Sequence, residues 1–370
     1  MKNKNLLIIV LSFLILFNFF HSFKLFEFNK IFINKFNIKM YEKRYNESQW
    51  VISESQNSIG DDFLYAYAGA KYVLGTDPIL INSETPPLGK NLIGLSAIYL
   101  GNEYLFSMFS GLFALITFYL LCKQVIKDKL VSLLLTLLAG LEPLFVVNYF
   151  ATLLDLLLFG FLNLFFLFLI KYRENNKFIF IYVSGIMLGL IMSIKFFALV
   201  LPAFASAVLY LVFKKDLKGL IHFTLSTILS FFILTINYFQ FFSKGRNLMD
   251  FLKLQKYIYI FHTEGRKATI RLNDSFLKLM FTGHFYSDPD LKKLSPENHF
   301  SFLWPIFFLI GIIKSIIDTS SPLFIWIIIY SLSQFFGFTN ARYLILLLPY
   351  LYLATIDIIL KCQFGKKQFS

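Results

Sequence analysis

Cysteine is nearly absent from this chain of 370 residues, which contains only Cys122 and Cys362. Both fall at predicted cytoplasmic ends of apolar segments, so we expect neither a disulfide nor a thiolate metal site. The sequence also lacks an internal repeat and a low-complexity linker. The first apolar segment, 6–20, has a basic start but no small-residue cleavage site after it, which predicts a retained helix rather than a removed signal peptide.

Apolar residues, in contrast, are abundant. They make up 57% of the chain, whereas a soluble domain has about 45–50%, and they fall in blocks of about 20 residues, the length that crosses a bilayer core. The net charge of +13 does not indicate nucleic acid, because Lys and Arg at helix ends face anionic lipid. We predict an all-α polytopic membrane protein with about ten spans, at 5–23, 103–122, 130–148, 151–171, 178–194, 196–213, 219–242, 302–317, 322–338 and 342–360.

The short loops predict the orientation of these spans. The loops 123–129, 171–177 and 214–218 and the C-terminal tail are basic, whereas the loops around 142–150 and 339–341 carry no Lys or Arg. Because basic short loops stay in the cytoplasm, both termini are expected there. The two long loops, 24–102 and 243–301, are then expected outside, within a single membrane-embedded domain that covers residues 1–370. Their stretches 25–41 and 251–262 mix aromatic and basic residues and predict interfacial helices.

Charged residues gather in the first outer loop. Asp61 and Asp62 begin a helical stretch, where acids also serve as ordinary helix caps. Glu84 follows in "SETPPLGK", and Lys90 lies in the first turn of the next predicted helix. A cation is unfavourable near a helix N-terminus, so Lys90 predicts a nearby anion, either the loop acids or a lipid phosphate.

Three more charged residues lie at predicted outer ends of spans. Asp155 lies inside an apolar segment, where an acid indicates a functional site, with a structural ion pair as the alternative. Lys195 and Arg342 lie at the same depth, and either could simply reach the interface. Glu142, at the outer end of the span before Asp155, is a further acid at that level.

Acids and cations at one membrane surface suit sugar transfer from a lipid-linked donor. Lys and Arg would bind the donor phosphate and stabilise it as it leaves. A carboxylate acting as general base would take the proton from an acceptor hydroxyl. The hydroxyl would attack the anomeric carbon from the face opposite the phosphate, so the configuration would invert.

The segments that carry these residues resemble a known family. "GDDFLYAYAGAKYVLG" (60–75) and "SETPPLGK" (83–90) are similar to the first outer loop of the dolichyl-phosphate-mannose protein O-mannosyltransferases, which are GT-C integral-membrane glycosyltransferases. The resemblance continues, in order, in segments 141–161, 184–202 and 341–354. It implies a GT-C-like bundle and transfer of a sugar, mannose first, from a polyprenyl-phosphate donor to an outer-face hydroxyl, Ser or Thr of a protein first.

The resemblance also implies roles for individual residues. Asp61 would be the catalytic base, with Asp62 beside it, and Glu84 and Asp155 would complete the acidic site. Lys195 and Arg342 would contact the donor phosphate. Thr85 stands where the family pattern has His, and Phe150 where it commonly has Arg, which leaves the donor and the acceptor open.

The sequence also bears on the cofactor and on the cellular location. The residues establish no cofactor, and a divalent metal held by Asp61, Glu84 and Asp155 stays an open alternative, because oxygen ligands without a defined spacing do not identify a metal. The chain lacks the extra outer domain of eukaryotic members of the family, which favours the cell membrane of a prokaryote.

Other functions fit the same residues. A related GT-C enzyme could transfer another sugar to a lipid or a cell-envelope glycan. A transporter or flippase could use intramembrane charges, although such carriers usually show two related halves. In a non-catalytic assembly subunit the acids would be caps and ion pairs, and Asp61→Asn would then be tolerated because Asn caps a helix as well as Asp does.

Overall fold

The computed structural model describes residues 2–195, 197–262, 272–287, 292–336 and 339–365. These residues are almost entirely helical, with one antiparallel strand pair, β1 (His284–Tyr286) and β2 (Leu294–Pro296). The predicted all-α membrane fold is confirmed. Parts of four predicted segments lie outside the described residues, namely residue 196 of the span 196–213, 263–271 and 288–291 of the second loop, 337–338 of the span 322–338, and 366–370 of the tail.

Each predicted span contains an apolar helix. Five stretches are long and apolar enough to cross a membrane among the described residues. They lie in α1 (Lys2–Ser22), α6 (Tyr104–Ile126), α9 (Asp155–Asn175), α12 (Leu217–Asn237), and η3 (Ala341–Leu346) with α18 (Leu348–Gly365). Four shorter apolar helices are α10 (Ile179–Ile194), α11 (Phe197–Phe213), α16 (Leu303–Ile317) and α17 (Pro322–Ser333).

The predicted span 130–148 is not one straight helix. It consists of α7 (Lys129–Gly140) and α8 (Pro143–Tyr149), which meet at an angle of 69°. Pro143 has no backbone N–H to continue the hydrogen bonds of α7, so it starts a new helix instead. The break places the carboxylate of Glu142 in the interior.

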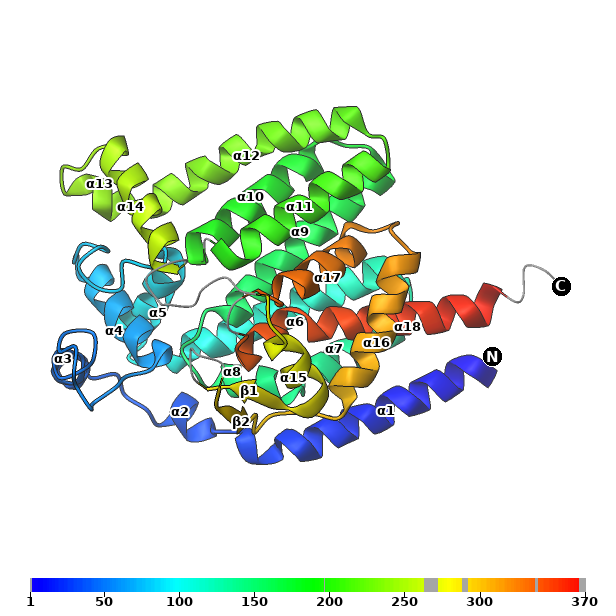
Figure 1. The fold of residues 1–370 in the computed structure, drawn as a ribbon, viewed down its shortest axis with the longest axis horizontal. Helices are drawn as coiled ribbons and strands as arrows, with labels where there is room; N and C mark the ends of the chain where they lie inside the picture. The colour runs from blue at the N-terminus through cyan, green and yellow to red at the C-terminus, as the bar shows by residue number, and fades with distance from the viewer. Residues whose placement is uncertain (1, 196, 263–271, 288–291, 337–338, 366–370) are drawn as a thin grey trace.

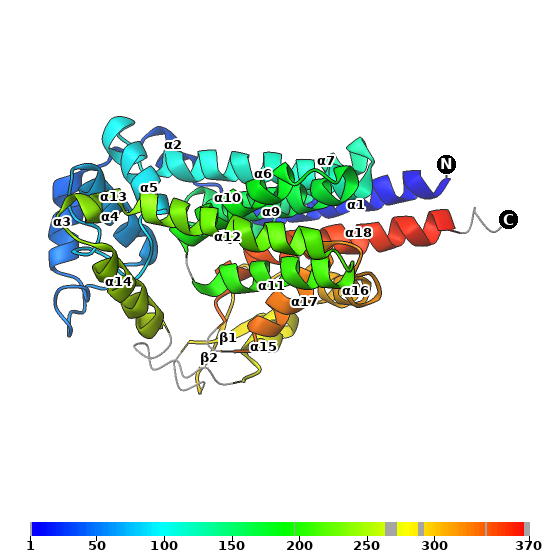
Figure 2. The same ribbon diagram turned by 90° about the horizontal axis from the view of Figure 1, so that it is seen from above.

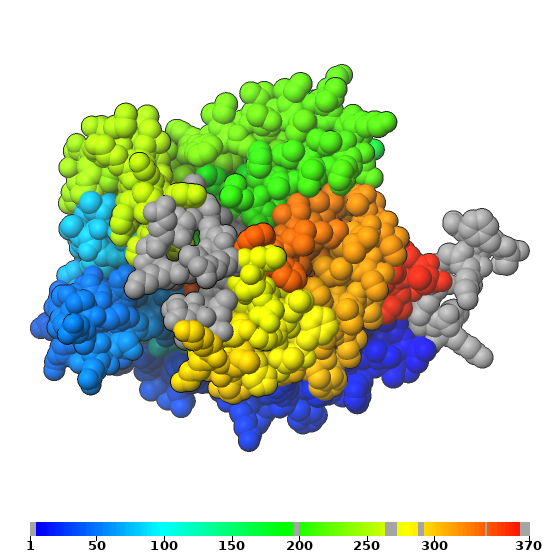
Figure 3. All heavy atoms as spheres, viewed as in Figure 1, coloured from blue at the N-terminus to red at the C-terminus, as the bar shows by residue number. Residues whose placement is uncertain are grey.

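The long loops contain the remaining helices. The first has the short 3₁₀ helix η1 (Phe23–Leu25), α2 (Phe28–Phe32), α3 (Ile38–Asn46), α4 (Asp61–Val73) and α5 (Leu88–Tyr99); the second has α14 (Leu248–Ile260) and α15 (Ser275–Thr282). The predicted span 219–242 is not one helix, because α12 ends at Asn237 and the short α13 (Phe239–Ser243) follows it. Both chain ends lie at one end of the molecule, and α3, α4, α13 and α14 lie at the other (Figures 1 and 2). Figure 3 shows the first-loop residues in blue beside the yellow-green residues of α13 and α14.

A pair of glycines lets α4 and α5 approach closely. A Cβ on Gly94 of α5 would lie 2.0 Å from the carbonyl oxygen of Gly69 in α4, and one on Gly69 would lie 2.0 Å from the carbonyl oxygen of Lys90. Backbone atoms cannot move aside without separating the helices. This contact therefore fixes the position of Asp61, which begins α4, relative to α5.

We expect Gly94→Ala to lower the free energy of unfolding by about 1–3 kcal/mol, the usual effect of an overpacked contact. Thermal melting in detergent measures the change. Leu95→Ala is the matched control, because that neighbouring side chain is exposed on the same helix. A Gly94→Ala protein that melts with the unmutated one would contradict the close approach.

A charged group joins two apolar helices, α16 and α18. Lys314 Nζ in α16 lies 2.7 Å from Asp357 Oδ2 in α18, and both side chains are buried. Lys361 also pairs with Asp357, at 2.9 Å. Because charges are paired when they are buried in apolar surroundings, this group holds α16 against α18.

Candidate functional site

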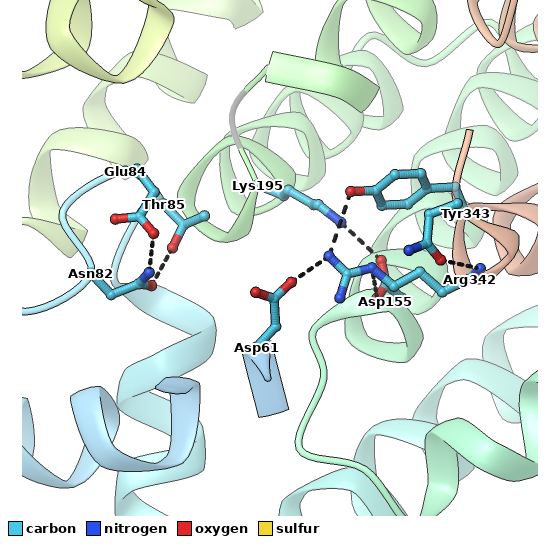
Figure 4. Close-up of polar contacts among 9 residues, drawn as sticks. Asp61, Asn82, Glu84, Thr85, Asp155, Lys195, Arg342 and Tyr343 are labelled. Atoms are coloured by element: carbon cyan, nitrogen blue, oxygen red, sulfur yellow. Dashed lines mark hydrogen bonds and ion pairs between the residues drawn. The ribbon is translucent and has the colours of Figure 1, made fainter. Parts of the chain in front are cut away.

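Four charged residues meet where four distant parts of the chain come together (Figure 4). Asp61 begins α4, Asp155 begins α9, Lys195 follows the end of α10, and Arg342 lies in η3. All four were sequence-predicted site residues. The predicted boundary between two helices at Lys195 is also confirmed, since α10 ends at Ile194 and the next helix begins at Phe197.

Asp155 is the buried centre of this charged cluster. Its side chain is 2% exposed and accepts a hydrogen bond of 3.1 Å from Lys195 Nζ. As the first residue of α9 it also lies at the positive end of the helix dipole, which favours a carboxylate. Lys195 is held from the other side by the ring of Tyr343, whose centroid is 4.3 Å from Nζ. These contacts fix the ammonium group in one place.

Arg342 links the two acids. Its Nη2 donates to Asp61 Oδ2 at 2.6 Å, across 281 residues of sequence, and its Nε lies 4.0 Å from Asp155 Oδ2. The Asn340 side chain caps η3 by accepting from the backbone N–H of Arg342 at 3.1 Å. One guanidinium therefore spans both carboxylates, a geometry that its planar set of donors suits.

The two neighbouring acids of α4 point in different directions. Asp61 reaches Arg342 and keeps 31% of its side chain exposed, the largest share in the charged cluster. Asp62 turns back toward the start of its helix, where a Cβ on Gly60 would lie 2.7 Å from its Oδ1. The structure thus brings Asp61, but not the carboxylate of Asp62, into the charged cluster.

Tyr65 lies one turn along α4 from Asp61 and is buried. Burial raises the pKa of its phenol well above the usual value, and the negative charge of Asp61 raises it further. Tyr65 therefore stays a neutral hydroxyl at ordinary pH.

Glu84 and Lys90 form a separate group. Lys90 Nζ donates to the backbone and side-chain oxygens of Asn82, at 2.6 and 2.9 Å, and to those of Thr85, at 2.8 and 3.0 Å. Asn82, in a left-handed conformation with φ of 55°, donates its amide to Glu84 Oε1. Lys90 is fully buried, so it holds the loop 82–87 in shape rather than joining Lys195 and Arg342.

The surroundings of Lys90 also affect its charge. Burial lowers the pKa of its ammonium group, and the nearby Glu84 carboxylate opposes that shift. The anion that its position predicts is thus Glu84, and the four oxygens of Asn82 and Thr85 take its hydrogen bonds.

We expect Lys90→Met to lower the free energy of unfolding by about 2–4 kcal/mol, because it leaves buried oxygens without a donor. Lys71→Met is the control, since Lys71 pairs with Glu42 at the surface and such pairs contribute less than about 1 kcal/mol. Thermal melting of both variants measures the difference. Equal melting temperatures for the two variants would contradict a structural role for Lys90.

Two residues near these groups, His262 and Tyr343, were not among the predicted site residues. His262, after α14, lies with Nε2 2.8 Å from the carbonyl oxygen of Glu84 and so connects the second long loop to the first. Tyr343 contacts both cations of the charged cluster, with its hydroxyl 3.5 Å from Arg342 Nη2. The position of Tyr343 directly after Arg342 could have indicated that it lies near the site. Nothing in the sequence indicates the contact between His262 and Glu84.

Glu142 does not join the charged cluster either. Its two carboxylate oxygens accept from Trp304 Nε1 at 2.9 Å and from Tyr352 OH at 2.5 Å, in the buried interior. It therefore connects the α7–α8 bend to α16 and α18, which is a structural role.

The acids do not form a metal site in this structure. Within the described residues, no three His, Cys, Asp or Glu side chains lie close enough together to hold an ion. Asp61 and Asp155 are paired with cations, and Glu84 belongs to the other group. The set Asp61, Glu84 and Asp155 thus does not fit a shared divalent metal.

Apolar helices with a charged cluster at their ends define a polytopic membrane protein. Comparisons with known proteins narrow this class. Residues 94–258 match the model of Glycosyltransferase family 87. The sequence matches none of the curated proteins with which it was compared.

Two solved structures have a similar fold. The crystal structure of ArnT from Cupriavidus metallidurans bound to undecaprenyl phosphate matches with a TM-score of 0.60 and 14% identity, over 84% of this chain and 57% of that one. The apo structure of the same protein matches with a TM-score of 0.59, with the same identity and coverage. The chain thus spans just over half the length of ArnT. The fold is GT-C-like, as predicted, and the matches support a glycosyltransferase; they do not distinguish the protein O-mannosyltransferases within that group.

Proposed function

We propose that this chain is a membrane glycosyltransferase that moves a sugar from a polyprenyl-phosphate donor to an acceptor hydroxyl, with inversion. The match of residues 94–258 to a glycosyltransferase family supports the reaction class. The similar fold of a protein that binds undecaprenyl phosphate supports the carrier. For the finer choice we propose mannose as the sugar and Ser or Thr of a protein as the acceptor, on the first-loop resemblance.

The observation that carries this proposal is the contact between Arg342 and Asp61, at 2.6 Å. While this contact is in place, the Asp61 oxygen that accepts from Arg342 is not available to an acceptor hydroxyl. A donor phosphate that binds Arg342 would compete for this contact and release Asp61. The base would then become active only when the donor is in place.

Each residue of the charged cluster has a distinct part in this mechanism. Arg342 and Lys195 bind the donor phosphate and stabilise its charge as the bond to the anomeric carbon breaks. Asp155, buried between them, holds both cations at that position. Asp61 takes the proton from the acceptor hydroxyl while the oxygen of that hydroxyl bonds to the anomeric carbon. The phosphate leaves as an anion, so no separate general acid is required.

The second group supports the site from a distance. In our proposal Lys90 and Glu84 are positioning residues, because they fix the loop 82–87 ahead of α5 through the contacts of Asn82 and Thr85. Asp62 stabilises the start of α4, where an acid suits the helix dipole. His262 ties the second loop to this support.

The location follows from the charge of the short loops. We propose that the whole chain, residues 1–370, works as one domain in the cell membrane of a prokaryote, with both termini in the cytoplasm and the site on the outer face. The separation of the chain ends from α3, α4, α13 and α14 supports this orientation (Figure 1).

A donor panel tests the function. Purified protein receives polyprenyl-phosphate sugars, mannose first, with Ser/Thr peptides, lipids or glycans as acceptors, and release of polyprenyl phosphate is followed. We expect one donor to be consumed only when a hydroxyl acceptor is present. A donor that binds but is never consumed with any acceptor would instead favour a carrier or an accessory subunit.

A further inference from the structure

A basic cavity lies at the end of the spanning helices opposite the charged cluster. Its volume is about 320 Å³, and it lies where α9 leads into α10 and α11 into α12. Asp155 begins α9, and Arg173 near its other end lines the cavity; at 1.5 Å per residue the two are about 27 Å apart along the helix. The cavity is therefore separate from the charged cluster. The α11–α12 turn that lines it lies toward the same end of the molecule as the chain termini (Figure 1).

Four cations line this cavity: Arg173, Lys214, Lys215 and Lys218. Among the described residues no carboxylate is ion-paired with any of the four. Lys127 of the neighbouring basic loop differs, because it pairs with Glu174 at 2.8 Å. The four cations thus keep their charge available for a ligand.

The single acid of the cavity, Asp216, is already engaged. Its Oδ1 accepts from the backbone N–H of Gly219 at 2.9 Å, and its Oδ2 accepts from Tyr172 OH at 2.8 Å. Lys215, beside it, has a left-handed backbone with φ of 54°, which is uncommon for a residue with a long side chain. Asp216 is thus engaged as the N-cap of α12, and the turn before the helix gathers the cations around it.

The surroundings of the cavity are apolar. Tyr172 and Phe178 stack at its wall, with ring centroids 5.8 Å apart. Several large side chains next to it in sequence are more than half exposed, namely Ile179, Phe213, Leu217 and Ile221. Exposed apolar surface on spanning helices contacts acyl chains, and cations at the helix ends meet headgroups.

We propose that this cavity binds the phosphate headgroup of an anionic phospholipid from the leaflet at this end of the protein. The four cations contact the phosphate, and the exposed apolar side chains below them contact the acyl chains. A soluble phosphate compound would use the cations but would gain nothing from that apolar surface. The site is independent of sugar transfer.

Native mass spectrometry of the purified full-length protein tests this site with phosphatidylglycerol and phosphatidylcholine. We compare the unmutated protein with Lys214→Ala/Lys218→Ala. The matched control is Lys123→Ala/Lys129→Ala, which removes the same charge from exposed lysines at the end of α6 and the start of α7, outside the cavity. Phosphatidylglycerol should be retained over phosphatidylcholine. Each lysine near an anionic headgroup contributes about a fivefold change in affinity, so Lys214→Ala/Lys218→Ala should weaken binding about 25-fold.

The other outcomes overturn the proposal. An equal loss in the Lys123→Ala/Lys129→Ala control would mean a diffuse charge effect without a site. Equal retention of phosphatidylcholine would exclude recognition of the anionic headgroup. Competition by glycerol 3-phosphate or inorganic phosphate at the affinity of phosphatidylglycerol would assign the cavity to a soluble phosphate. Melting curves of both variants check that the fold is retained, as expected for exposed or half-exposed lysines.

Discussion

Asp61→Asn is expected to reduce sugar transfer by about 10²- to 10⁴-fold, the usual effect of removing a general base. Asn has nearly the same shape and is well tolerated at the start of a helix, so α4 should remain folded. The amide cannot accept the proton of the acceptor hydroxyl. The rate of polyprenyl-phosphate release, with a separate measurement of donor binding, gives the result.

Asp62→Asn is the matched control for this variant. It changes the adjacent residue of the same helix in the same way, but the carboxylate of Asp62 points toward Gly60 and not toward Arg342. We expect this variant to keep far more activity than Asp61→Asn. If Asp62→Asn were the inactive protein and Asp61→Asn the active one, the base would have to be reassigned.

Arg342→Lys is expected to weaken the use of the donor by about 10- to 100-fold in kcat/KM, although the positive charge remains. An ammonium group cannot span two partners as a guanidinium does, and a charge-assisted hydrogen bond is worth about 1.5–3 kcal/mol. Most of the loss should appear as a higher KM for the donor, since the phosphate contact is made on binding. Steady-state kinetics with the donor found in the panel measures both constants.

Lys244→Met controls for charge in the two long loops. Lys244 is exposed between α13 and α14, so its loss lowers the positive charge without touching the charged cluster. Its kinetics should match those of the unmutated protein. Unchanged donor affinity in Arg342→Lys would argue against a phosphate contact by this residue.

The spanning helices could be predicted because apolar length is a local property. Each predicted span contains an apolar helix, and the break at Lys195 is where the sequence placed it. The bend at Glu142 was missed because the apolar run continues across Pro143, and hydropathy alone does not detect a break that the interior stabilises. The hydrogen bonds that Glu142 accepts at this bend come from Trp304 and Tyr352, which are more than 160 positions away in sequence.

The charged cluster was predictable for a different reason. Asp155, Lys195 and Arg342 are costly at the ends of apolar spans, so each stood out alone. The grouping of Glu84 and Lys90 with Asn82 was not predictable, because it depends on a left-handed residue and on backbone oxygens. A lysine near a helix start indicated an anion, but the sequence could not show that loop oxygens would surround it.

The central claim is that the charged cluster binds the donor phosphate and that this binding frees Asp61. A structure of the protein with bound polyprenyl phosphate tests it most directly. The account predicts the phosphate within hydrogen-bond distance of Arg342 and Lys195, and the 2.6 Å contact between Arg342 and Asp61 lengthened or broken. A phosphate bound elsewhere, with Arg342 still on Asp61, would contradict it.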